Sequence, residues 1–204
     1  MNRCLAALFA AALSSLALPA GAQVVEAPAP GLREHDGFFL QLQTGPAFLD
    51  VSQDRIGVGG SGFGLHLAAG GSPIENLVLY GEVFTQWATR PTLEVDGEEF
   101  ESDDSTSLSL THFAPGVAYY FGRSNFFLGG SVGWTEAELE VGSRQAGASG
   151  VGVRIGAGKE WWIADQWGLG VGANFFTASL ADDEDEDARL NATSFAVNLT
   201  ATFH

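Results

Sequence analysis

The chain has 204 residues, of which 46% are hydrophobic and 17% are charged, and its 25 acidic residues outnumber the 9 lysines and arginines. The formal net charge of −16 argues against binding to DNA or RNA, because proteins that bind nucleic acids need a basic surface. The apolar content also argues against an acidic disordered chain, which would lack hydrophobic and aromatic residues. Glycine is frequent, with 27 residues, about twice the average share of ~7%.

The first 22 residues have the pattern of a secretory signal peptide. Arg3 gives a positive start, residues 5–18 are almost wholly apolar, and Ala20-Gly21-Ala22 forms an A-x-A cleavage site. A transmembrane anchor is the alternative, but the cleavage site that follows directly favours a signal. Cys4 would leave with the signal, so the mature chain would have no cysteine, no disulfide and no cysteine-bound metal. Its net charge would be −17, because Arg3 is also removed.

Residues 23–35 contain Pro28 and Pro30 and show little periodicity, which predicts a flexible lead-in. From Asp36 onward, hydrophobic residues recur with period two, which is typical of β-strands. Eight strands are expected, at residues 37–44, 62–70, 77–87, 108–121, 126–135, 151–162, 167–176 and 194–203.

The fourth of these strands is irregular. Leu108 and Leu110 fall on one face, whereas Phe113 and Val117 fall on the other. Pro115 lies between the two pairs and cannot donate a hydrogen bond to a neighbouring strand. We therefore expect either a β-bulge at this point or a strand that projects beyond the membrane at its start.

The connections between the strands differ in length. Short turns are expected at residues 70–76, 122–125 and 164–166, and longer loops at residues 49–61, 88–107, 136–150 and 180–193. Short turns at one end and long loops at the other are typical of outer-membrane barrels. The sequence therefore predicts an all-β fold, an eight-stranded antiparallel up-and-down transmembrane β-barrel, over residues 36–204.

A secreted lipocalin-like barrel also has eight alternating strands. The residues on the polar face of the strands distinguish such a soluble barrel from a membrane barrel. A soluble barrel would cover that face with charged residues. Here it consists mainly of Gly, Ser, Thr, Gln and Asn, which suits a narrow interior, whereas the other face carries Phe, Leu, Val and Trp for lipid contact. A closed sheet also pairs every backbone group, as hydrocarbon requires.

Three isolated charges fall on the predicted interior face: Glu82, Arg154 and Glu160. An unpaired charge would be costly there, so we expect Arg154 to form a luminal ion pair with Glu82 or Glu160. We favour a structural pair over a gate or a proton path. Eight strands enclose an interior that side chains fill, so a diffusion pore is not expected.

Most acidic residues fall in the predicted long loops. The residues expected in acidic loops are Glu94, Asp96, Glu98, Glu99, Glu101, Asp103, Asp104, Asp182, Asp183, Glu184, Asp185, Glu186 and Asp187, with Glu136, Glu138 and Glu140 opening the third loop. Clustered carboxylates suit divalent cations, but Ala188 replaces the glycine that an EF-hand loop requires. A solvated charge run is the simpler interpretation, with weak cation binding or cation bridging to lipopolysaccharide as hypotheses.

Aromatic residues gather beside the expected short turns, which predicts a girdle at one membrane interface. Its expected members are Tyr119, Tyr120, Trp161, Trp162 and Trp167. Lys159 shares the parity of the lipid-facing residues, and near a turn its amine could reach the lipid headgroups.

Motifs for catalysis are weak. Residues 57–62 match G-x-G-x-x-G, but a strand follows them where a dinucleotide site needs a helix, so we expect a glycine-rich loop. The histidines are His35, His66, His112 and His204, and no serine on the strand of His66 is placed to act as a nucleophile beside it. No catalytic, cofactor-binding or metal-binding residue is expected.

The chain resembles the small outer-membrane β-barrels of Gram-negative bacteria, the OmpA/OmpX-like family. The resemblance covers residues 36–204 and includes Tyr119-Tyr120-Phe121-Gly122 before a turn and Gly158-Lys159-Glu160-Trp161-Trp162 before another. The last strand ends in an aromatic residue, Phe203, although His204 follows where the family usually ends on the aromatic. The resemblance implies location in the outer membrane.

These observations lead to one expected function and two alternatives. We expect a structural or surface-interaction protein without catalysis or cofactor, in contact with outer-membrane lipid and lipopolysaccharide, with divalent cations at the acidic loops as possible partners. It would bind no nucleic acid and would act as a monomer. The first alternative is a narrow channel for small solutes, and the second is a lipid-A-modifying enzyme.

Overall fold

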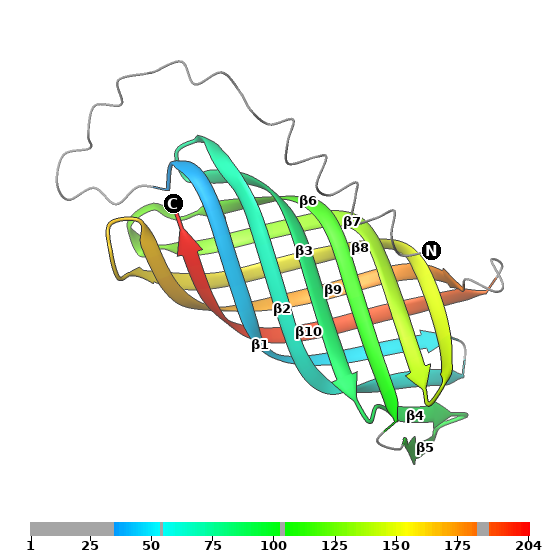
Figure 1. The fold of residues 1–204 in the computed structure, drawn as a ribbon. Coiled ribbons are helices and arrows are strands. Elements are labelled where there is room, and N and C mark those ends of the chain that lie inside the picture. The colour runs from blue at the N-terminus through cyan, green and yellow to red at the C-terminus, as the bar shows by residue number, and fades with distance from the viewer. Residues whose placement is uncertain (1–34, 54, 103–104, 183–187) are drawn as a thin grey trace. The chain divides into compact units, whose positions relative to one another are not determined.

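The computed structural model describes residues 35–53, 55–102, 105–182 and 188–204. Eight long antiparallel strands form a barrel (Figure 1), and within the described residues no helix is long and apolar enough to cross a membrane. The barrel strands are β1 (Gly37–Gln53), β2 (Ile56–Ile74), β3 (Leu77–Thr89), β6 (Thr106–Tyr120), β7 (Phe126–Val141), β8 (Arg144–Trp162), β9 (Trp167–Asp182) and β10 (Arg189–Phe203). The connection between β3 and β6 carries a hairpin of β4 (Thr92–Val95) and β5 (Glu98–Glu101), and a 3-10 turn, η1 (Gly122–Ser124), follows β6.

The sheet closes on itself because β1 pairs with both β2 and β10. Leu40 lies opposite Phe203 at one end of the β1–β10 seam, and Ser52 lies opposite Asn191 at the other. Each remaining barrel strand pairs with its neighbours in chain order. The eight-stranded antiparallel up-and-down barrel predicted from the sequence is confirmed.

Of the two explanations expected for the irregular fourth strand, the structure excludes the β-bulge at Pro115. Phe113 pairs with Trp134 and Gly116 pairs with Ser131, so the register between β6 and β7 is the same on both sides of the proline. Pro115 removes a hydrogen bond from the ladder without inserting an extra residue. The other expected explanation, a strand that projects beyond the membrane at its start, agrees with the structure, as the interior of the barrel shows below.

Two of the expected long loops are strands instead. β1 and β2 continue as far as Gln53 and Ile56, and β7 and β8 meet at a tight turn in which Gly142 has a φ of +61°. The expected glycine-rich loop at residues 57–62 is likewise part of β2, paired with β1. Both errors have one cause: the alternation of inward and outward side chains continues through these segments.

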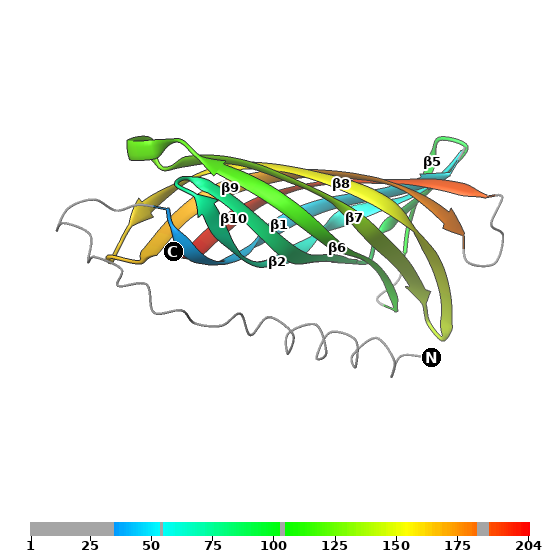
Figure 2. The ribbon, with the colours of Figure 1, turned by 90° about the horizontal axis from the view of Figure 1, so that it is seen from above.

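The two ends of the barrel are distinct. The turn end carries the connections after β2, β6 and β8 together with Gly37 and Phe203, the outer residues of the closing strands. The distal end carries the β4–β5 hairpin, and Figures 1 and 2 place that hairpin opposite the C-terminus. These two names are used below.

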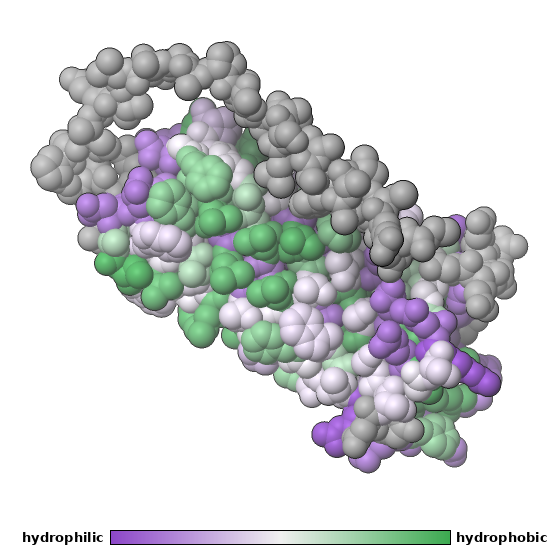
Figure 3. Space-filling model, viewed as in Figure 1, coloured by the Kyte–Doolittle hydropathy of each residue, from purple (hydrophilic) through white to green (hydrophobic). Residues whose placement is uncertain are grey.

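A broad apolar belt covers the outside of the barrel next to the turn end. Figure 3 shows hydrophobic residues over the middle of the strands and hydrophilic residues gathered around the β4–β5 hairpin. Exposed members of the belt include Phe38, Leu67, Leu79, Trp87, Leu128, Ile155, Trp161, Leu169, Phe175 and Leu199. An exposed apolar surface of this extent marks contact with a membrane.

The height of the belt fits an outer membrane. Leu77 and Trp87, which bound it on β3, lie ten residues apart on one strand. At a rise of ~3.3 Å per residue and a tilt of ~40°, this separation spans about 25 Å, which is the height of the apolar band of outer-membrane barrels. A closed barrel with such a belt is a protein of the outer membrane, as the sequence predicts.

The polarity of the wall inverts beyond the belt. On β7, Glu136, Glu138 and Glu140 occupy the outward positions, whereas Ala137 and Leu139 face the interior. Most inward positions of the other strands at this level are also apolar, and include Leu49, Val51, Val58, Leu108, Leu110, Ala148, Leu180, Leu190 and Ala192. The distal part of the barrel is therefore built like a water-soluble barrel, polar outside and apolar inside.

This inversion explains the irregular fourth strand. Leu108 and Leu110 are buried in the interior, in register with every other even-numbered residue of β6. Phe113 and Val117 face outward because they lie at the level of the membrane. The pattern changes face because the environment changes, not because the strand is broken.

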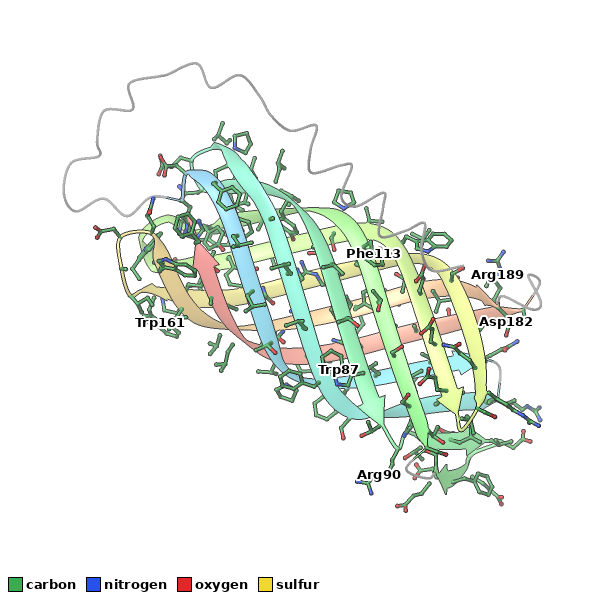
Figure 4. The ribbon with its side chains drawn as sticks, viewed as in Figure 1. Trp87, Arg90, Phe113, Trp161, Asp182 and Arg189 are labelled. Carbon is green, nitrogen blue, oxygen red and sulfur yellow. The ribbon has the colours of Figure 1, made fainter. Side chains whose placement is uncertain are left out.

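Of the five residues predicted for the aromatic girdle, three lie on the outer face and two have the inward parity of their strands. Tyr119, Trp161 and Trp167 are exposed on the outer face, and Figure 4 shows Trp161 at the turn end. Tyr120 is fully buried and Trp162 packs beside the buried His204 ring, because adjacent residues on a strand point to opposite faces.

Lys159 lies beside this girdle. Its amine lies 4.4 Å from the centre of the Phe126 ring and donates a hydrogen bond to the carbonyl oxygen of Ser124 at 2.6 Å. The charge thus sits at the edge of the belt and not in its middle.

Candidate functional site

A bidentate ion pair occupies the lumen at the level of the membrane. Arg154 Nη2 lies 2.5 Å from Glu82 Oε2, and Arg154 Nε donates to Glu82 Oε1 at 2.9 Å. The same guanidinium donates to the hydroxyl of Tyr80 at 3.0 Å and to Asn174 Oδ1 at 2.8 Å. Both charged side chains are buried. Four hydrogen bonds hold the arginine in one geometry.

Glu82 has two further partners. The hydroxyl of Ser131 donates to Glu82 Oε1 at 2.5 Å, and His66 Nε2 lies 2.9 Å from Glu82 Oε2. Every oxygen of this carboxylate is therefore occupied. Within the described residues, the His66 ring thus pairs with the Glu82 carboxylate and not with a serine hydroxyl.

Glu160 lies apart from this cluster. It accepts hydrogen bonds from Gln41 Nε2 at 3.1 Å and from the hydroxyl of Thr202 at 2.5 Å. Arg154 and Glu160 share the inward face of β8, but six residues separate them, which is about 20 Å along a strand. Of the two pairings considered from the sequence, the structure brings together Arg154 and Glu82.

A chain of amides links the two clusters. From Arg154, hydrogen bonds run to Asn174, from Asn174 Nδ2 to Gln43 Oε1 at 2.8 Å, and from Gln43 Nε2 to Gln41 Oε1 at 2.6 Å. Gln41 then donates to Glu160. The lumen at membrane level is thus filled by one connected polar network.

Two histidines close the turn end of the lumen. His35 Nδ1 lies 3.0 Å from His204 Nε2, and the His35 ring stacks on Tyr120 with 3.9 Å between ring centres. Burial and the neighbouring His204 lower the pKa of His35 from 6.5 to about 4. The predicted flexible lead-in therefore ends before His35, which is buried in the barrel end; residues 23–34 and the expected signal peptide lie outside the described residues.

Beyond the polar network, three rings fill the lumen. The centres of the Phe84 and Phe176 rings are 5.3 Å apart, and those of His112 and Phe176 are 5.1 Å apart. Leu110 is fully buried among the same group of apolar side chains. Sequence reasoning missed this apolar layer, because it expected small and amide side chains throughout the bore. The pair Leu108 and Leu110 was the signal that could have revealed it.

Above this layer, the distal mouth contains a pocket of about 180 Å³. Seven of the eight barrel strands contribute to its wall. The lining residues are Val51, Gln53, Ile56, Val58, Leu108, Ala137, Glu138, Leu139, Ala146, Gly147, Ala148, Asp182 and Leu190. Four of them, Val51, Leu108, Ala137 and Ala148, also belong to the apolar layer, which forms the floor of the pocket.

The acidic residues of the distal end lie mostly on strands. Glu94 is on β4, Glu98, Glu99 and Glu101 are on β5, and Asp96 lies in the turn between them, 3.3 Å from Arg55. Figure 4 shows Asp182, the last residue of β9, at the same end. Asp103, Asp104, Asp183, Glu184, Asp185, Glu186 and Asp187 lie outside the described residues. In the part of the chain that is described, no group of three or more His, Cys, Asp or Glu residues could hold a metal ion.

Comparison with known proteins shows the fold. No family model and no curated protein matches the sequence. Among solved structures, Neisserial surface protein A is similar to this chain with a TM-score of 0.59 and 16% identity, over 82% of this chain and 96% of that protein. The chain has the fold of the small outer-membrane barrels.

Two other barrels match with lower scores. Ail, the attachment invasion locus protein of Yersinia pestis, has a TM-score of 0.47 and 11% identity over 82% of this chain and 99% of that chain. OprG from Pseudomonas aeruginosa has a TM-score of 0.47 and 10% identity over 85% of this chain and 99% of its own. The match to Neisserial surface protein A confirms, for the fold, the resemblance to small outer-membrane barrels noted in the sequence.

Proposed function

We propose that the protein is a non-conducting barrel of the outer membrane whose distal end serves as a surface for interaction. The observation that carries this proposal is the filled lumen. Phe84, His112 and Phe176 are 3%, 0% and 1% exposed, so the apolar layer is as shielded from water as a protein core. The polar network from Arg154 to Glu160 lies below it. A solute would have to displace both layers to pass.

The distal end is the part of the barrel that is free to interact. Short turns of outer-membrane barrels face the periplasm, so the distal end faces the outside of the cell. Its outward positions are acidic or polar, and Figure 3 shows this hydrophilic surface around the β4–β5 hairpin. Neisserial surface protein A, which shares the fold, is by its name also a surface protein.

The partners that we propose follow from the division of the outer surface into an apolar belt and a polar distal end. We propose that the apolar belt contacts membrane lipid and lipopolysaccharide, and that divalent cations bridge Glu98, Glu99 and Glu101 to lipopolysaccharide phosphates. The barrel would act as a monomer. A catalytic role has no support in the lumen, because His66 faces Glu82 and His112 hydrogen-bonds to Thr135 at 2.9 Å.

The experiment is a conductance measurement on the purified barrel in planar lipid bilayers. We expect no conductance steps from the inserted wild-type protein. Heat-modifiable gel migration of the same preparation shows that the barrel is folded, so that silence does not arise from unfolded protein. Steady single-channel steps from folded wild-type barrel would overturn the proposal and favour the narrow channel.

A further inference from the structure

We propose that the pocket at the distal mouth binds one small molecule with an apolar body and a positively charged end. This inference deepens the proposed function, because it names the chemistry that the distal surface would recognise. It rests on the lining of the pocket, on its volume, on its closed floor and on the charge around its rim.

The lining is apolar although the mouth lies outside the membrane. Val51, Val58 and Leu190 point inward from β1, β2 and β10, where the polarity of the wall is already inverted. Ile56, at the first residue of β2, is more than half exposed. Apolar surface left in contact with water is unfavourable, so an apolar occupant that displaces the water would be stabilised.

The volume limits the size of the occupant. The pocket measures about 180 Å³. A dry protein cavity of about 150 Å³ lined by leucine, isoleucine and phenylalanine accommodates benzene. One aromatic ring with a short substituent therefore matches this pocket, whereas a lipid with two acyl chains is far too large.

The floor of the pocket is closed, so a ligand can bind in the pocket without passing through the barrel. Leu108, Ala137 and Ala148 form part of both the pocket and the buried apolar layer beneath it. A ligand that enters from the distal end therefore stops at this layer. The pocket can bind a molecule even though the barrel conducts none.

The charge around the pocket selects the sign of the ligand. None of the lining residues is basic, whereas Glu138 and Asp182 are acidic. The β4–β5 hairpin, which pairs with the first residues of β2, adds Glu94 and further carboxylates at the same end. A negative mouth concentrates cations and repels anions. Glu138 faces outward from β7, whereas Asp182 occupies an inward position of β9, so an amine at the end of the ligand would lie toward Asp182 at the rim.

The experiment uses three probes of nearly equal size: 2-phenylethylamine, which is cationic, 2-phenylethanol, which is neutral, and phenylacetate, which is anionic. Binding is measured by saturation-transfer NMR on the full barrel in lipid nanodiscs, with empty nanodiscs as the blank. We expect the amine to bind more tightly than the alcohol, and phenylacetate not to bind.

Two variants of neighbouring residues on β8 locate the site. Ala146 lines the pocket, whereas the exposed Gln145 does not. We expect Ala146→Phe to fill the pocket and abolish binding of the amine, and Gln145→Phe to leave it unchanged. Heat-modifiable gel migration establishes that both variants are folded.

A third variant tests the charge. Asp182→Asn is expected to weaken binding of 2-phenylethylamine about threefold to fivefold, the value of one exposed charge contact, and to leave 2-phenylethanol unaffected. The inference is overturned if no probe binds above the blank, if Ala146→Phe binds as the wild type does, or if phenylacetate binds as tightly as the amine. These binding tests are independent of the conductance measurement. If they fail while the barrel conducts no ions, the inference about the pocket is refuted and the proposed function stands.

Discussion

Removal of Arg154 tests how strongly the luminal network stabilises the barrel. In Arg154→Met the methionine fills much of the same volume but donates no hydrogen bond. Glu82 then loses two donated hydrogen bonds, and Tyr80 and Asn174 each lose one. The carboxylate of Glu82 remains buried beside His66 with no permanent positive charge in contact with it.

The expected cost is large because the charge that remains cannot reach water. Removing one partner of a buried ion pair destabilises proteins by about 3–5 kcal/mol, whereas replacing both partners by neutral groups often costs much less. We therefore expect Arg154→Met to lower the free energy of unfolding by about 3–5 kcal/mol. The double variant Glu82→Gln with Arg154→Met should recover more than half of that loss.

The assay is urea unfolding in lipid vesicles, followed by tryptophan fluorescence and by heat-modifiable gel migration. Arg144→Met is the matched control, because Arg144 lies on the same strand but is exposed, and its replacement should change the unfolding free energy by less than about 0.5 kcal/mol. If Arg154→Met is no more destabilising than this control, or if the effects of the two luminal changes simply add, the reasoning about a coupled buried pair is refuted.

Three further predictions concern other parts of the barrel. Phe176→Ala should cost about 3–5 kcal/mol, because it leaves a cavity in the apolar layer, and a shift of the urea midpoint measures it. Gly62→Ala should abolish heat-modifiable migration, because its Cβ would clash with the main-chain oxygen of Trp87 on β3, whereas Gly81→Ala, with nothing within 4 Å of its Cβ, should fold normally. The pKa of His35 is lowered to about 4, so the unfolded chain binds the proton more tightly. The stability that this histidine contributes is present above pH 6.5 and is lost as the pH falls toward 4, by up to about 3 kcal/mol. His35→Gln should remove that part of the pH dependence, and an unchanged pH profile would contradict the assignment.

The sequence predicts the membrane part of the fold well because lipid imposes a strict rule on each strand. Phe38 and Leu42 had to face outward and Gln41 and Gln43 inward, and the structure places them so. The inward orientation of Arg154 follows from the same alternation, because its neighbours Val153 and Ile155 face the lipid. Alternation with period two in an apolar environment leaves no other arrangement.

The sequence does not predict which carboxylate meets Arg154. Glu82 and Glu160 both have inward parity, and the choice between them depends on how far β3 and β8 are staggered around the barrel. That stagger is fixed by the register of every strand pair between them. The errors at Tyr120 and Trp162 are simpler, since neighbouring residues on one strand cannot both face the lipid.

The distal wall was the largest error, and its cause supports the proposed pocket. The sequence predicts a loop over residues 136–150, which Glu136, Glu138 and Glu140 open. The alternation in this segment is intact, however, with Glu138 outward and Ala137 and Leu139 inward. A strand outside the membrane has water on its outer face, so its apolar residues must turn toward the lumen. Eight strands that do this together surround an apolar space, and where their side chains are as small as alanine that space remains partly open. The pocket is therefore a direct consequence of a barrel wall that continues beyond the bilayer. Ala146→Phe would fill the pocket without changing a residue of the apolar layer below. If the pocket is the binding site, this variant abolishes ligand binding; if the ligand only associates with a poorly ordered mouth, binding persists.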